Sequence, residues 1–209
     1  MNPQMQSHLF WGKTSPLSSL SGAALLVIAS VRISSALLCG LALVFVYVFV
    51  MAAAKLGGEY FPVWGRSVVL LFLSSLAAGI FQLILGLVSP VLALESAFFV
   101  FFVPVTFIAS GLCGRVIEYD LGEVLSESLS EALILGGLIV GLSLIREPLG
   151  FGSVSFPGLD IIRFIKNEQP VKIELLRFLQ TSAGAFILLG YGYAIFRHYR
   201  NQITNSEDD

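Results

Sequence analysis

The sequence predicts an all-α integral membrane protein in which six transmembrane helices form two inverted three-helix repeats, with the first and fourth spans broken. Composition is the first reason: 56% of the 209 residues are hydrophobic and 12% are charged, whereas soluble domains carry about 25% charged residues. Second, six apolar segments approach the length of about 20 residues that a spanning helix needs. Third, one segment in each half is short or interrupted, which is typical of inverted repeats with a site at their interface.

The membrane domain is expected over residues 18–196, between an N-terminal tail (residues 1–17) and a polar C-terminal tail (residues 197–209). Its two repeats occupy about residues 18–89 and 92–196. No small-residue cleavage site follows the first span, so we expect that span to be retained rather than removed as a signal peptide. The expected spans, in chain order, are residues 18–31, 33–54, 67–89, 92–114, 128–145 and 180–196.

The first and fourth spans are irregular. The first is short, and the fourth is an apolar run interrupted by Pro104, Gly111 and Gly114. Both contain the tripeptide Ile-Ala-Ser, at 28–30 and 108–110, followed within a few residues by an arginine. An unpaired backbone group in hydrocarbon is costly, and irregular backbone survives there only when it is buried in protein or lines a cavity. The breaks therefore predict an activity inside the membrane rather than a simple anchor.

The other four spans are regular. Residues 33–54 and 67–89 are uninterrupted and long enough to cross the bilayer. Residues 180–196 follow the domain's longest loop, have Ser-Ala-Gly-Ala from Ser182, and end before a basic tail. Residues 128–145 have a glycine-lined face, which consists of Gly136, Gly137 and Gly141.

The loop between the fifth and sixth spans, residues 146–179, begins with glycines and prolines that indicate turns. Residues 160–180 then alternate apolar and charged side chains, and Leu159, Ile162 and Ile165 fit one helical face. This pattern favours a surface helix lying at the headgroup level. The alternative is a docking surface for a partner subunit.

Several polar residues are candidates for function. Arg32 is most simply a turn residue whose guanidinium reaches water, and the alternative is a buried counter-charge near an ion path or cofactor. Gln82 is expected to face the bundle interior, because an unsatisfied amide is costly in a membrane. Glu123, Glu127 and Glu131 share one helical face, where negative charge stabilises a helix N-terminus. Glu131 lies inside the span and is the better candidate for a cation contact.

Cys39 and Cys113 are the two cysteines of the chain, and both lie in apolar surroundings. Two thiolates are half of the four ligands that an iron–sulfur cluster needs, so a cluster requires a partner subunit to supply the others. The alternative is that both behave as small buried hydrophobic residues. The sequence contains no glycine-rich phosphate loop, nucleophile–base pair, His-rich metal motif or basic patch. We therefore expect neither a self-contained hydrolase or nucleotide-binding enzyme nor a nucleic-acid-binding protein.

Three motifs resemble the paired six-span membrane subunits of the Rnf and Nqr electron-transport complexes, nearest to the Rnf E / Nqr D type. They are FVPVTFIASGLCGR at 102–115, LIREPLGFG at 144–152 and SAGAFILLGYG at 182–192. The resemblance extends over roughly residues 20–196. It implies a multi-pass subunit of a bacterial inner-membrane complex that couples electron transfer across the bilayer to sodium or proton transport. It also implies a homologous six-helix partner subunit and further subunits of the complex.

The same resemblance implies a 2Fe–2S cluster held at mid-membrane by two cysteines from each subunit of the pair. The family's cysteine positions correspond to Ser110 and to about Ala24 in this chain, so the ligand set is altered here, because serine replaces soft sulfur poorly. Cys113 lies three residues beyond Ser110, and Cys39 lies in the second span. Cys113, Cys39 and Ser110 are the candidate cofactor-binding residues. The alternatives to an electron-transfer subunit are a membrane transporter component and a cofactor-free structural subunit.

Overall fold

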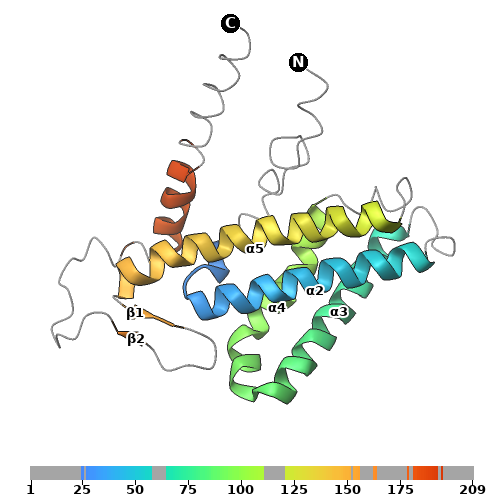
Figure 1. Cartoon of the computed structure of the whole chain (residues 1–209), viewed down its shortest axis with the longest axis horizontal. Helices are drawn as coiled ribbons and strands as arrows, with labels where there is room; N and C mark the ends of the chain where they lie inside the picture. Colours follow the sequence, from blue (N-terminus) through green and yellow to red (C-terminus); the bar gives the residue numbers. More distant parts are fainter. Residues whose placement is uncertain are drawn as a thin grey trace, which may run out of the picture.

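The computed structural model describes residues 25, 27–57, 65–110, 121–151, 153–155, 162–163, 178, 181–192 and 194. Four long helices account for most of these residues: α2 (Ile33–Gly57), α3 (Arg66–Val88), α4 (Pro90–Ala109) and α5 (Leu121–Phe151) (Figure 1). Each is long and apolar enough to cross a membrane, and a shorter apolar helix covers Ser182–Gly192. The chain is therefore a multi-pass membrane protein.

The second and third expected spans are confirmed, because α2 and α3 cover residues 33–57 and 66–88. The fourth span differs from the expectation at Pro104, where α4 continues without a break to Ala109. Membrane helices tolerate an internal proline when neighbouring groups satisfy the freed backbone, and Pro104 is buried in the bundle. Gly111 and Gly114 lie outside the described residues, so a break at these two glycines stays a prediction.

The fifth helix is longer than expected. It covers Leu121–Phe151 rather than 128–145, and it continues through Arg146 and Pro148, which the sequence pattern had assigned to a loop. The expected surface helix over 160–180 is wrong at Ile162–Arg163, which form strand β2 and pair antiparallel with β1 (Ser153–Val154). Pairing of β1 with β2 gives these backbone N–H and carbonyl groups hydrogen-bond partners on another strand, whereas a helix would supply the partners within itself. The other residues of that segment lie outside the described ones, except Phe178.

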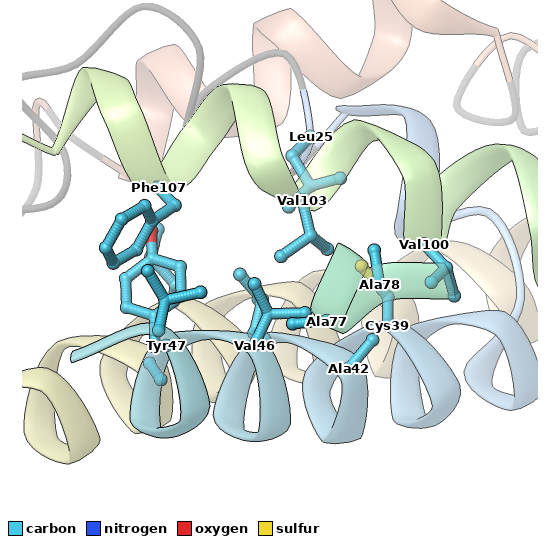
Figure 2. Close-up of a cluster of buried hydrophobic side chains, with 14 of the residues drawn as sticks. Leu25, Cys39, Ala42, Val46, Tyr47, Ala77, Ala78, Val100, Val103 and Phe107 are labelled. Atoms are coloured by element: carbon cyan, nitrogen blue, oxygen red, sulfur yellow. The ribbon is translucent and has the colours of Figure 1, made fainter. Parts of the chain in front are cut away.

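Helix α2 is the centre of the bundle. Helix α5 lies along one side of it in the antiparallel direction, and the α3–α4 hairpin packs on another side (Figure 1). Small side chains line the contact with the hairpin, and the edge-to-face ring pair of Tyr47 and Phe107, with centroids 5.1 Å apart, closes one end of it (Figure 2). The buried small residues at this contact are Cys39, Ala42, Ala77 and Ala78.

The contact between α2 and α5 depends on two glycines. A Cβ atom placed on Gly136 would lie 3.3 Å from the Cα of Gly40, so the two backbones approach each other directly. In a bilayer, helices associate mainly through van der Waals packing, and small residues permit that close approach. Of the three glycines on the predicted face, Gly136 makes this contact, while a Cβ on Gly137 or Gly141 would meet nothing within 4 Å.

A single residue, Ser89, joins α3 to α4. Its N–H donates to the Leu85 carbonyl at 2.8 Å, and its Oγ accepts from the Leu92 N–H at 3.5 Å. Pro90 follows at the first helical position, where its missing N–H removes no helical hydrogen bond. Gln82 lies between the two helices, as expected, and its Nε2 donates to the Ala93 carbonyl.

We predict that Gly136→Leu weakens the α2–α5 contact by about 1–3 kcal/mol, because the added side chain meets the backbone of Gly40. For a chain of this size that corresponds to a lower thermal unfolding midpoint, by roughly 2–4 °C per kcal/mol. The matched control is Gly137→Leu, one residue along, which should leave the midpoint in mild detergent unchanged. Equal midpoints for the two variants would contradict the packing described here.

Candidate functional site

The helical path is interrupted between the first apolar segment and α2. Residues 27–29 are helical, Ser30 and Val31 form a turn, and α2 begins at Ile33. The break falls where the sequence pattern ended the first span, at Arg32. At such a break the carbonyl groups of one helix end and the N–H groups of the next helix start both lose their helical partners.

The carbonyl side of the break is satisfied by Arg146 of α5. Its Nη1 donates to the Val27 carbonyl at 2.9 Å and to the Ser30 Oγ at 2.6 Å. Its Nη2 donates to the Thr181 carbonyl at 3.3 Å. Arg146 is 1% exposed, so this arginine is held inside the protein by contacts with distant parts of the chain.

The N–H side of the break is satisfied by the next residue, Glu147. Its Oε2 accepts from the Ile33 N–H at 2.7 Å, and the side chain is 2% exposed. A carboxylate at a helix N-terminus and a cation at a helix C-terminus both complement the helix dipole. Two adjacent residues of α5 therefore supply opposite charges to the two helix ends that meet at the break.

Hydroxyl groups complete the surroundings. Ser35 Oγ donates to the Ala29 carbonyl at 3.1 Å and to the Arg32 carbonyl at 2.9 Å. Thr181 Oγ1 accepts from the Gly184 N–H at 3.3 Å, so the residue that Arg146 contacts also caps the helix Ser182–Gly192. We call the group around the break the polar junction; it consists of Val27, Ser30, Ile33, Arg146, Glu147 and Thr181.

The polar junction joins segments that are far apart in the sequence. Arg146 donates to three neutral oxygen atoms, and Glu147 accepts from a backbone N–H. Among the described residues, no three His, Cys, Asp or Glu side chains lie close enough together to hold a metal ion. The arrangement can orient the first apolar segment, α2 and the last helix relative to α5.

The cofactor-binding candidates fall elsewhere. Cys39 is buried in α2, in the same cluster as Ala42, Ala78 and Val100 (Figure 2). Ser110 lies at the C-terminal end of α4, where its Oγ donates to the Phe107 carbonyl at 2.7 Å. Cys113 and Ala24 lie outside the described residues.

The structure does not bring Cys39 and Ser110 together. Ser110 follows Phe107, which packs on Tyr47, whereas Cys39 lies eight residues, about 12 Å, before Tyr47 along α2. Cys39 has an aliphatic environment, and the Ser110 hydroxyl bonds to its own helix. The described residues thus supply one thiol and one hydroxyl at separate places, which do not fit an iron–sulfur cluster.

The buried arginine of this region is Arg146 rather than Arg32. Arg32 is exposed, in agreement with a turn residue that reaches water and against a buried counter-charge. Arg146 and Glu147 were missed as site residues because an arginine after an apolar run normally marks the end of a span. The sequence feature that could have indicated these two residues is the pair of opposite charges directly before Pro148, inside the motif LIREPLGFG.

The acidic residues of α5 become more buried along the helix. Glu123 is exposed in the first turn, Glu127 is half-buried, and Glu131 is buried in the bundle. Glu118 and Asp120 lie outside the described residues. The interior position of Glu131 agrees with its assignment to the span, and a cation contact there stays a prediction.

Comparison with known proteins adds one similarity. No protein-family model matches the chain. The chain is 38% identical over 85 residues to an uncharacterized protein of Treponema pallidum (strain Nichols). That match covers 39% of this chain and 40% of the Treponema protein, so less than half of each is compared. The similarity indicates a related segment and assigns no activity.

We predict that Arg146→Ala lowers the free energy of unfolding by about 1–3 kcal/mol for each buried acceptor that it leaves without a donor. Val27 and Ser30 are the buried acceptors concerned. The measurement is the thermal midpoint of the purified chain in mild detergent. Arg32→Ala removes an exposed arginine from the same break and serves as the control. A loss as large for Arg32→Ala would show that Arg146 has no special role.

We predict that Glu147→Leu exposes the first turn of α2, whereas Glu147→Gln keeps an oxygen that can accept from the Ile33 N–H. Loss of a helix cap costs about 1 kcal/mol. Hydrogen exchange of the amides at 33–36 should therefore be faster in Glu147→Leu than in Glu147→Gln. Unchanged exchange in both variants would mean that the carboxylate does not cap α2.

Proposed function

We propose that this chain is a membrane subunit of an Rnf/Nqr-type ion-translocating oxidoreductase complex in the bacterial inner membrane. In that role it supports electron transfer across the bilayer, which the whole complex couples to sodium or proton transport. Its proposed partners are a homologous six-helix membrane subunit and the other subunits of the complex. The observation that carries the proposal is that Arg146 and Glu147, within the resembling motif LIREPLGFG, contact the first apolar segment, the start of α2 and Thr181, which directly precedes a second such motif.

One of the three resembling motifs contributes directly, and a second begins just after a junction residue. LIREPLGFG supplies Arg146 and Glu147, and SAGAFILLGYG forms the helix that begins after Thr181. Their contacts are with the first apolar segment, through Val27 and Ser30. Arg146 and Glu147 of a resembling motif thus hold the turn between the first apolar segment and α2, and irregular backbone of this kind supports the proposal of a site between the repeats.

The proposed contribution of the chain's own residues is to position these segments. Arg146 and Glu147 hold the two helix ends at the break, and the buried contact of Gly40 with Gly136 keeps α5 close enough to α2 for them to do so. An iron–sulfur cluster would supply one-electron chemistry to such a complex. Since the described donors do not fit a cluster, no electron-transfer step is assigned to residues of this chain.

A cofactor-free structural subunit of such a complex is the second candidate. It is favoured by the hydroxyl of Ser110, which is used within its own helix, and by the aliphatic surroundings of Cys39. This candidate keeps the membrane partner and the position in the complex, and it leaves the redox centres to other subunits.

The test is purification of the tagged chain from its native membranes in mild detergent, followed by mass spectrometry of the bound proteins. We expect a second six-helix membrane protein together with flavin and iron–sulfur subunits. Isolation of the chain without redox subunits, with specific binding of a small solute or ion by the chain alone, would instead indicate a transporter component.

We predict that Cys39→Ala leaves the iron and acid-labile sulfide content of that purified complex unchanged, because the thiol is surrounded by alanine and valine side chains. Electron paramagnetic resonance of the reduced complex should show the same signals as the wild type. Cys113→Ala is the parallel variant at the other candidate ligand. A fall in iron for Cys39→Ala would restore this residue as a cluster ligand.

A further inference from the structure

The outward side of α4 combines an apolar surface with one acidic residue. Val91, Leu94, Phe98 and Phe101 are exposed and have the spacing of one helical face, with Glu95 exposed among them. We call these five residues the α4 outer face. Its chemistry differs from that of an ordinary lipid-facing helix surface because of the carboxylate.

Glu95 lies in the second turn of α4, with exposed apolar residues on both sides of it along the helix. It is about 7.5 Å along α4 from Pro90, and the residues nearer to the α3–α4 turn are also apolar and exposed, with Leu87 at 89% and Leu94 at 81%. The sequence contains no other charged residue between Arg66 and Arg115. An acidic side chain in such a position faces a protein interior or a partner charge far more often than lipid.

The described part of the chain supplies no partner for this side chain, since no hydrogen bond or ion pair of the Glu95 carboxylate occurs there. Lipid hydrocarbon would leave a carboxylate unpaired, which is costly. Water would instead meet the large exposed side chains of Leu87, Leu94 and Phe98. A protein surface that is apolar and carries one cation both pairs the Glu95 carboxylate and covers the apolar side chains around it.

We propose that the α4 outer face docks a membrane-embedded helix of another subunit, and that this helix presents a lysine or arginine to Glu95. Phe98 and Phe101 would supply the large apolar contacts of the interface, a role in which aromatic residues are common. The cation fixes the register of the partner helix, because a helix docked in another register leaves both the cation and the Glu95 carboxylate unpaired in the membrane. The docking surface goes beyond the proposed function and does not depend on it, since any membrane partner of this chemistry fits.

The first test is photo-crosslinking in native membranes from Phe98→p-benzoylphenylalanine, with Leu76→p-benzoylphenylalanine on the exposed side of α3 as the control. We expect position 98, and not position 76, to cross-link to one membrane protein within a segment that has a lysine or arginine inside an apolar stretch. Adducts with lipid alone, cross-links within the chain itself, or a partner segment without a basic residue would each overturn the proposal.

The second test changes the charge. Glu95→Lys should lower the amount of that partner recovered with the chain by about tenfold or more, and Glu95→Gln should have a smaller effect. Glu123→Gln, at an exposed position of α5, should leave recovery unchanged. Exchange of the partner's basic residue for glutamate should restore recovery of the partner with Glu95→Lys. Unchanged recovery with Glu95→Lys, together with no effect of the partner exchange, would overturn the proposal.

The two tests remain decisive if a charge variant fails to fold, because the cross-linking variant keeps Glu95. They also separate this proposal from the proposed function. A cross-linked partner that is a basic membrane helix but belongs to no redox complex supports the docking surface and contradicts the Rnf/Nqr assignment.

Discussion

The hydrogen bonds of Arg146 and Glu147 hold the turn between the first apolar segment and α2 in place. A break leaves carbonyl groups on one side and N–H groups on the other, and in hydrocarbon neither set has water to replace its lost partners. The arginine donates to the carbonyl of Val27, and the glutamate accepts from the N–H of Ile33. Because the two residues are neighbours on one helix, a single element supplies both charges with the sign that each helix end requires.

That arrangement requires α5 to lie close to α2 along its length, which the glycine contact allows. Gly40 and Gly136 bring the two backbones together about two turns from the break, so the side chains of Arg146 and Glu147 reach the start of α2. The α3–α4 hairpin uses the same means, with alanines and Cys39 at its contact with α2. Close packing of small residues replaces the hydrophobic driving force that is absent between helices in lipid.

These contacts give the chain two kinds of surface within one bundle. Inside, the polar groups of the junction bond to one another. Outside, the α4 outer face has an exposed carboxylate amid large apolar side chains. The junction holds the turn before α2, and the outer face is the surface at which we propose that a partner docks.

The sequence by itself determined the membrane class, the two regular spans at α2 and α3, and the end of the first apolar segment at Arg32. These follow from hydropathy and from the position of a charged residue between apolar stretches, which are local properties of the chain. It could not identify Arg146 and Glu147 as buried, because their partners Ser30 and Ile33 lie 116 and 114 residues away. It could not distinguish Gly136 from Gly137 either, since adjacent helical residues point in different directions and only the packing of α5 on α2 decides which one is inside. Only the tertiary structure decides these points, because the energy of a buried charge or of a close backbone contact depends on the residues opposite it. The local sequence pattern does not specify those residues.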